Sequence, residues 1–173
     1  MAYTFIKATG LEIGKSLVEE DKLDLALMLL KKAKDRGVKI LLPVDVIVAR
    51  EFSNVVAFTS VDIDKIPKDM MGLDVGKKSI KLFVAEIKRS ETTLWNGPMG
   101  VFEMSNFAEG TLEVAQAMSI SKGITIIGGG DSASAVLQFG LSDKFTHIST
   151  GGGAALEFIG GKELPGISIL EDK

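Results

Sequence analysis

The residues of this chain best suited to chemistry lie in three glycine-rich turns, each of which follows a β-prone run. They are Asn96-Gly97-Pro98-Met99-Gly100, Gly128-Gly129-Gly130-Asp131-Ser132 and Thr150-Gly151-Gly152-Gly153. Turns of this kind leave backbone N–H groups bare, and in an open α/β sheet the carboxyl ends of the strands bind phosphate through such groups. The sequence therefore predicts a phosphate-binding edge.

The second and third turns favour a ligand over a purely structural role. A triple glycine is more than a helix cap needs, so nucleotide phosphates at a helix N-terminus, with Asp131 as a ligand of Mg²⁺, explain the second turn best. The alternative is a tight turn with Asp131 as an N-cap. The third turn predicts a cradle for a transferring phosphoryl group, or else close packing of strand and helix.

Other candidate groups carry weaker signals. Glu103 could accept hydrogen bonds from a ribose, although a glutamate in a turn is usually solvated. His147 is the only histidine and lies in a predicted strand, where a structural role argues against a histidine-based triad or a zinc site. The stretch from Gly72 to Ser79 approaches a Walker A loop but fails in its glycine spacing and has Lys78 in place of Ser or Thr.

The composition limits the classes of function. The net charge of −3 provides no basic surface for nucleic acid or an anionic membrane. The absence of cysteine excludes disulfides and thiolate metal sites, and it fits a cytoplasmic protein. No apolar run approaches the length of a membrane span. We expect a cytoplasmic protein without nucleic-acid or membrane partners.

Strands and helices alternate along the chain. The predicted strands are Val38–Leu42, Thr92–Trp95, Ile124–Ile127 and Thr146–Ser149, and the runs Val46–Ala49 and Val55–Phe58 suggest a hairpin or a strand-like excursion. The alternation predicts an α/β fold, a Rossmann-like three-layer sandwich with a mainly parallel sheet. Because a helical segment at residues 1–8 has no strand ahead of it, we expect the domain to lack its leading strands.

Motifs along nearly the whole chain resemble phosphoglycerate kinase. They are Met1–Phe5, Leu41–Asp45, Trp95–Glu103, Gly128–Ser132, Phe139–Leu141, Ser149–Ala154 and Gly161–Gly166. The resemblance implies that residues 1–173 are part of the C-terminal, nucleotide-binding domain of a longer glycolytic enzyme. That enzyme moves a phosphoryl group between 1,3-bisphosphoglycerate and ADP, giving 3-phosphoglycerate and ATP.

The resemblance also implies roles for single residues. Gly151 and Gly152 would stabilise the transferring phosphoryl group, and Asp131 would hold Mg²⁺. The residues that would bind ADP or ATP are Gly72, Leu73, Asn96, Pro98, Gly100, Val101, Glu103, Gly129, Gly130, Asp131 and Ser132. Within this set, Glu103 would hold the ribose, and Gly72 and Leu73, in a Gly-Leu-Asp turn, would border the adenine.

In the family, a glycine-rich turn and a lysine-bearing stretch precede the position of Met1, and 3-phosphoglycerate binds to a separate N-terminal domain. We therefore expect weak, Mg²⁺-dependent nucleotide binding, contact with 3-phosphoglycerate only through the missing domain, and self-association through the truncated edge. A non-catalytic nucleotide-binding module or a self-associating fragment is the alternative. An unrelated phosphate-binding α/β fold would place the glycine loops on opposite edges of the sheet.

Overall fold

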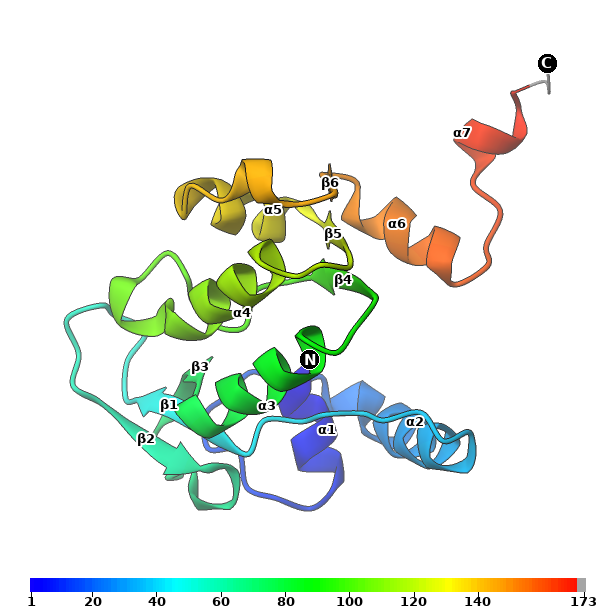
Figure 1. The fold of residues 1–173 in the computed structure, drawn as a ribbon. Coiled ribbons are helices and arrows are strands. Elements are labelled where there is room, and N and C mark those ends of the chain that lie inside the picture. Colours follow the sequence, from blue (N-terminus) through cyan, green and yellow to red (C-terminus); the bar gives the residue numbers. More distant parts are fainter. Residues whose placement is uncertain (171–173) are drawn as a thin grey trace. The chain divides into compact units, whose positions relative to one another are not determined.

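The computed structural model describes residues 1–170, and the chain divides into two compact units. Unit 1 comprises Met1–Ala85 and Met99–Val114, and unit 2 comprises Glu86–Pro98 and Ala115–Lys173. Figure 1 shows the order of the elements along the chain. Helices α3 (Lys77–Ile87) and α4 (Glu109–Ser119) each contain residues of both units.

Unit 1 is built around an antiparallel sheet with the strand order β2-β1-β3. Its strands are β1 (Asp45–Ala49), β2 (Phe58–Asp62) and β3 (Met71–Val75), and its first helices are α1 (Ala2–Ala8) and α2 (Leu23–Asp35). Short 3₁₀ turns cover Glu20–Lys22, Ile63–Lys65 and Ser105–Phe107. Strand β1 lies at the centre of the sheet, between β2 and β3, and four of its five residues are buried. Its β-branched side chains favour a strand conformation.

Two apolar clusters hold unit 1 together. Val46, Val48 and Ile66 form one cluster, against which Tyr3 packs. Ala49, Leu73 and Phe107 form the other, with Ile47, Val56, Met71, Val101 and Met104 at its margin. Phe58 meets Phe107 edge-on, with ring centroids 5.5 Å apart. Residues that follow the first glycine-rich turn thereby pack with Leu73 of β3.

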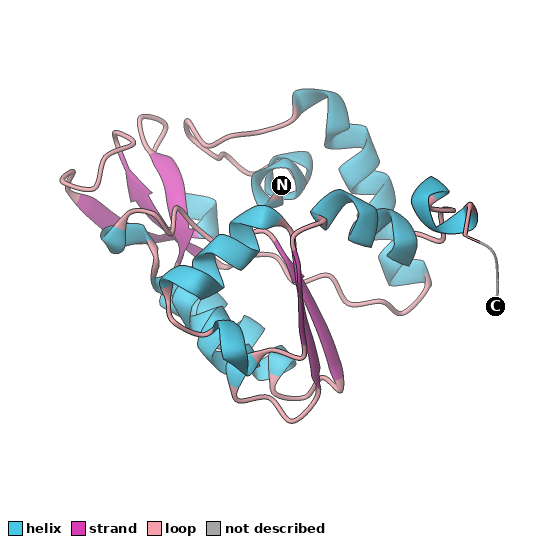
Figure 2. Cartoon of the chain, turned by 90° about the horizontal axis from the view of Figure 1, so that it is seen from above, coloured by secondary structure: helices cyan, strands magenta, loops and turns pink. Residues whose placement is uncertain are grey.

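Unit 2 contains a parallel sheet with the order β4-β5-β6. Figure 2 draws the strands of the chain in magenta and its helices in cyan. The elements of unit 2 are β4 (Thr92–Asn96), β5 (Ile124–Gly128), α5 (Gly130–Gln138), a 3₁₀ turn (Ser142–Lys144), β6 (His147–Ser149), α6 (Gly152–Ile159) and α7 (Pro165–Ser168). Trp95 and Ile127 on the sheet and Val136 on α5 are buried. The predicted α/β class with a parallel sheet is confirmed.

The sequence predictions for unit 1 need three corrections. Val38–Leu42 is not a strand: it runs as an extended loop, no strand among residues 1–170 pairs with it, and Val38 is 58% exposed. In the second predicted run, Val55–Phe58, only Phe58 belongs to a strand, β2. The Gly-Leu-Asp segment is no turn, since it lies within β3 and pairs with β1. Pairing with β1 distinguishes the Gly-Leu-Asp segment, which is a strand, from Val38–Leu42, with which no described strand pairs.

Helix α2 carries apolar side chains that the described structure leaves exposed. They are Leu25, Leu27, Met28 and Leu29. None of the helices within residues 1–170 combines the length and the apolar character needed to cross a membrane.

Candidate functional site

The carboxyl ends of the three parallel strands in unit 2 lie in one row. Asn96 at the end of β4 pairs in register with Gly128 at the end of β5, which pairs with Ser149 at the end of β6. All three glycine-rich turns begin at this row. The prediction that they open on one edge of the sheet is confirmed, and a fold with the glycine loops on opposite edges is excluded.

The second and third turns pack directly against each other. A Cβ built on Gly152 would lie 2.7 Å from the Cα of Gly129, which is closer than two non-bonded carbon atoms can approach. The Gly129 N–H also donates to the carbonyl of Ser149 at 3.0 Å. Gly129 has a φ of +93°, so this position favours glycine for its backbone as well. Close strand–helix packing, considered above as an alternative, is therefore present here.

Asn96 connects the ends of the three strands. Its side-chain nitrogen lies 3.2 Å from a Cβ built on Gly128, 3.4 Å from one built on Gly129 and 3.3 Å from one built on Gly152. The Asn96 amide therefore borders both glycine turns. Because Asn96 is itself exposed, its side chain adds a polar group to the edge where helices α5 and α6 begin.

Helix α5 begins at Gly130 and presents the amides of its first turn at this edge. Such amides have no acceptor within their own helix. The Asp131 carboxylate in the same turn is exposed and takes part in no hydrogen bond or ion pair between described residues. No group of three metal-ligating side chains occurs within residues 1–170. One exposed carboxylate at the N-terminus of α5 still fits Mg²⁺, which usually takes one or two carboxylates together with waters and phosphate oxygens of the substrate.

Ser132 has a different surrounding from the one that the sequence suggested. Its side chain is fully buried, and its hydroxyl accepts the N–H of Gly97 at 2.7 Å. The indole N–H of Trp95 donates to the Gly97 carbonyl at 2.6 Å, and the Trp95 side chain is buried. The Ser132 hydroxyl therefore connects the first turn to the second, while its backbone N–H remains in the first turn of α5.

The first turn is not a set of bare amides, and that part of the prediction is wrong. The N–H groups of Met99 and Gly100 donate to the Thr111 hydroxyl at 3.1 and 3.3 Å, and the Val101 N–H donates to the Leu73 carbonyl at 2.9 Å. Since α4 and β3 supply acceptors for these amides, the turn cannot offer them to phosphate.

Gly72 and Leu73 occupy adjacent positions in β3. The Tyr3 hydroxyl fills the place of a side chain at Gly72, since a Cβ there would lie 1.6 Å from it. Burial, together with the nearby charge of Asp74, raises the pKa of Tyr3 to about 12. Leu73 is buried in the cluster that Val101 joins. Glu103 is exposed, and its proposed contact with a ribose stays a prediction.

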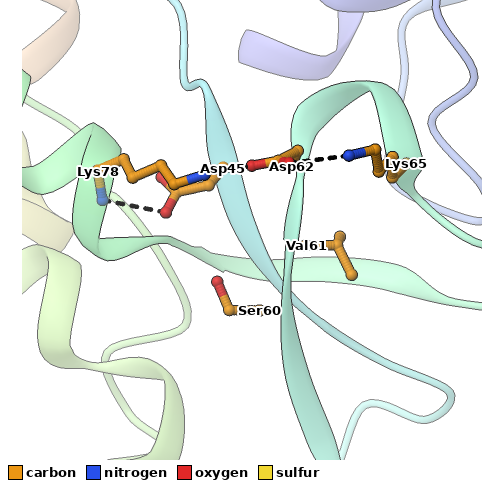
Figure 3. Close-up of a pocket in the computed structure, with 6 residues that line it drawn as sticks. All are labelled: Asp45, Ser60, Val61, Asp62, Lys65 and Lys78. Atoms are coloured by element: carbon orange, nitrogen blue, oxygen red, sulfur yellow. Dashed lines mark hydrogen bonds and ion pairs between the residues drawn. The ribbon is translucent and has the colours of Figure 1, made fainter.

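None of the predicted site residues lines a hollow of about 360 Å³ in unit 1 (Figure 3). It is lined by Asp45, Ser60, Val61, Asp62, Lys65 and Lys78. Lys78 and Lys65 both pair with Asp62, at 2.5 and 3.1 Å, and hydrogen bonding to Lys78 lowers the pKa of Asp62. The Asp45 carboxylate accepts the N–H groups of Lys78 and Ser79 and so caps the N-terminus of α3.

Sequence patterns missed two buried polar residues beside the first turn, Thr111 and Asp74. The one available signal for Asp74 was a carboxylate inside an otherwise apolar run that ends at Val75. His147 lies in β6 as predicted, but it is exposed and not packed in the core.

Comparison with known proteins agrees with this architecture. The family model described as phosphoglycerate kinase matches residues 1–162. The phosphoglycerate kinases of Finegoldia magna and Clostridium novyi are 55% and 58% identical to the chain, and each match covers 100% of it but 44% of the relative. The chain thus spans less than half the length of these relatives.

Solved structures give the same result for the fold. Phosphoglycerate kinase from Coxiella burnetii superposes with a TM-score of 0.93 at 43% identity, over 97% of this chain and 44% of that chain. The enzyme from Pyrococcus horikoshii superposes with a TM-score of 0.80 at 31% identity, over 95% of this chain and 41% of that chain. The chain therefore belongs to the phosphoglycerate kinase family.

Proposed function

We propose that this chain supplies the Mg-nucleotide-binding part of a phosphoglycerate kinase and that residues 1–173 correspond to part of the C-terminal domain. The observation that carries the proposal is the row formed by Asn96, Gly128 and Ser149, where two glycine turns meet and two helices begin. Strand ends of this kind are the usual place for a phosphate ligand in a parallel sheet. The whole enzyme would transfer a phosphoryl group between 1,3-bisphosphoglycerate and ADP.

Unit 2 would bind the charged end of the nucleotide. The backbone amides of Gly130, Asp131 and Ser132 start α5 and would donate to phosphate oxygens, favoured by the positive end of the helix dipole. Gly129 would let the phosphates approach the backbone. Asp131 would hold Mg²⁺, which screens the negative charge of the phosphates when it is bound. Gly151 and Gly152 would stabilise the transferring group at the start of α6.

The nucleoside end would be bound through residues that the family resemblance points to. They are Gly72, Leu73, Asn96, Pro98, Gly100, Val101 and Glu103. The inward hydrogen bonds of Met99, Gly100 and Val101 support this division, because they leave the turn without amides for phosphate. 3-Phosphoglycerate would bind only through a separate N-terminal domain, and we place the reaction in the cytoplasm.

The role of Asp131 predicts a specific loss on substitution. In Asp131→Ala, the stimulation of ADP binding by Mg²⁺ should disappear, because no other carboxylate extends from the first turn of α5. A lost charge-assisted contact is worth roughly 1.5–3 kcal/mol, so the affinity for Mg-ADP should fall by about tenfold or more. Isothermal titration calorimetry with and without Mg²⁺ measures both quantities.

Asp143→Ala is the matched control. It removes an equally exposed aspartate of unit 2, which pairs only with Lys144 among the described residues. We expect Asp143→Ala to bind Mg-ADP like the parent chain. If Asp131→Ala retained the full Mg²⁺ stimulation, the assignment of Asp131 would be wrong.

We also propose that the chain associates with itself through α2, whose apolar side chains Leu25, Leu27, Met28 and Leu29 are exposed. Met28 on this helix is 55% exposed, and burial of one such side chain contributes about 1.5–3 kcal/mol. Met28→Glu should weaken association by about tenfold or more in sedimentation equilibrium. Ala85→Glu, at an exposed position of α3, is the control and should leave association unchanged. A parent chain that is strictly monomeric at all measured concentrations would contradict the proposal.

A further inference from the structure

Asp74 is a buried carboxylate near the end of β3, with 3% of the residue exposed. No lysine or arginine within residues 1–170 forms an ion pair with it. The titratable groups that act on it are Tyr3 from α1 and Glu109 from α4, and Glu109 is itself 3.6 Å from the Lys77 ammonium. Burial is the main reason that the pKa of Asp74 is raised to about 6, and the charge of Glu109 adds to it.

The Asp74 carboxylate joins β3 to the start of α4. One oxygen accepts the N–H of Gly110 at 2.8 Å, and the other accepts the N–H of Val75 at 2.8 Å. A Cβ built on Gly100 would lie 2.3 Å from the carboxylate, and so would one built on Gly110. The carboxylate is therefore packed against the backbone of both the first glycine-rich turn and α4. Neither glycine has a positive φ, so it is this close approach that excludes a side chain.

The residues next to these contacts support the loop Met99–Val101. Thr111, which follows Gly110 on α4, accepts the N–H groups of Met99 and Gly100. Leu73, which precedes Asp74 on β3, accepts the N–H of Val101. The two elements that Asp74 joins are thus the same two elements that hold the loop.

We propose that Asp74 is the positioning residue of the loop Met99–Val101: its ionised carboxylate holds the start of α4 against β3 and thereby fixes the backbone that faces the nucleoside. The proposal rests on the proposed function, which assigns this loop to the nucleoside. Asp74 does not touch the nucleotide and acts through Gly100, Thr111 and Leu73. Protonation removes the charge that strengthens the hydrogen bond from Gly110, so the loop loses its fixed position as the pH falls through the pKa of Asp74.

A pH titration of the backbone amide resonances of the full chain tests this role without any substitution. We expect the amides of Val75 and Gly110 to shift with a midpoint near pH 6, together with the side-chain carboxyl carbon of Asp74. The amides of Met99, Gly100 and Val101 should shift with the same midpoint. Constant loop amides, with Val75 and Gly110 titrating, would reduce Asp74 to a cap of α4 and overturn the proposal. So would a Gly110 amide that does not titrate in this range.

Two substitutions test the connection between Asp74 and the loop further. Glu109→Gln removes a neighbouring negative charge from an exposed position, so the midpoint of all the responding amides should move together to lower pH. Thr111→Val removes the acceptor for Met99 and Gly100. The Gly110 amide should still titrate in this variant, while the response of Met99 and Gly100 should be lost. Loop amides that ignored both substitutions would contradict the proposed connection.

Adenosine is the probe that relates loop position to binding, since it carries no phosphate that titrates near pH 6. We expect its affinity to be about threefold weaker at pH 5 than at pH 7.5, and Glu109→Gln should shift this dependence to lower pH. Binding that is equal at both pH values would show that Asp74 does not position the loop for the nucleoside. If adenosine did not bind at either pH, the assignment of this loop to the nucleoside would fail, while the amide titrations would still decide whether Asp74 positions the loop.

Discussion

A polypeptide of these 173 residues should transfer phosphoryl groups from ATP to 3-phosphoglycerate at least about a thousandfold more slowly than the roughly 1–100 s⁻¹ typical of kinases. Phosphoryl transfer depends almost entirely on positioning and charge stabilisation, and positioning alone can supply about 7–11 kcal/mol of the barrier reduction. The chain covers 44% of the Clostridium novyi enzyme. We propose that 3-phosphoglycerate binds to the part that it does not cover. A coupled assay on homogeneous protein measures the rate.

Complementation separates a missing domain from a failed nucleotide site. Addition of the uncovered part of the Clostridium novyi enzyme should raise the rate by at least about tenfold, and Asp131→Ala should remove the gain. A rate in the normal kinase range from the 173-residue chain alone would contradict the proposal that 3-phosphoglycerate binds to the part of the enzyme that the chain does not cover. Nucleotide binding without any gain on complementation would instead favour a non-catalytic nucleotide-binding module.

Gly152→Ala should damage the site strongly, whereas Gly153→Ala should not. The new Cβ at position 152 would overlap the Gly129 backbone, at 2.7 Å from its Cα, so the two glycine turns must separate. Overpacking of this kind costs about 1–3 kcal/mol, and we expect Mg-ADP affinity to fall by about tenfold or more. Thermal unfolding and calorimetry measure the two effects.

The neighbouring glycine is the control because it lies in the same helix with nothing within 4 Å of a new Cβ. Alanine is preferred to glycine in a helix by up to about 1 kcal/mol, so Gly153→Ala should leave stability equal or slightly raised. Equal behaviour of the two variants would mean that the contact between the turns does not support the site.

The parallel strands of unit 2 were predictable because each is a short apolar run that ends in a glycine-rich turn. Local sequence is sufficient there, and the shared edge follows from the parallel arrangement. The segment Val38–Leu42 has the same local character, yet it is not a strand, and no strand of the described structure pairs with it. The local sequence pattern therefore indicates a tendency to form a strand, but it does not show whether a neighbouring strand pairs with the segment.

The antiparallel sheet and the support of the first turn depend on contacts between distant positions. Gly72 and Asp74 interrupt the apolar character of β3, and only the pairing with β1 shows that this segment is a strand. The bond from Gly97 to Ser132 spans 35 residues, and the contact of Asp74 with Gly110 spans 36. The sequence identified Gly100 and Ser132 as site residues, but it could not reveal that their polar groups are used inside the protein.

Mapping Mg-ADP binding on the backbone amides of the full chain by nuclear magnetic resonance tests the nucleotide-binding role most directly. We expect the largest shifts at Gly129–Ser132 and Gly151–Gly153, with further shifts at residues 96–103. The amides around Asp62 and Lys78 should not change, because the lysines there are already paired with Asp62. Shifts confined to that hollow, or no shifts at saturating Mg-ADP, would contradict the assignment of this chain as the nucleotide-binding part of a phosphoglycerate kinase.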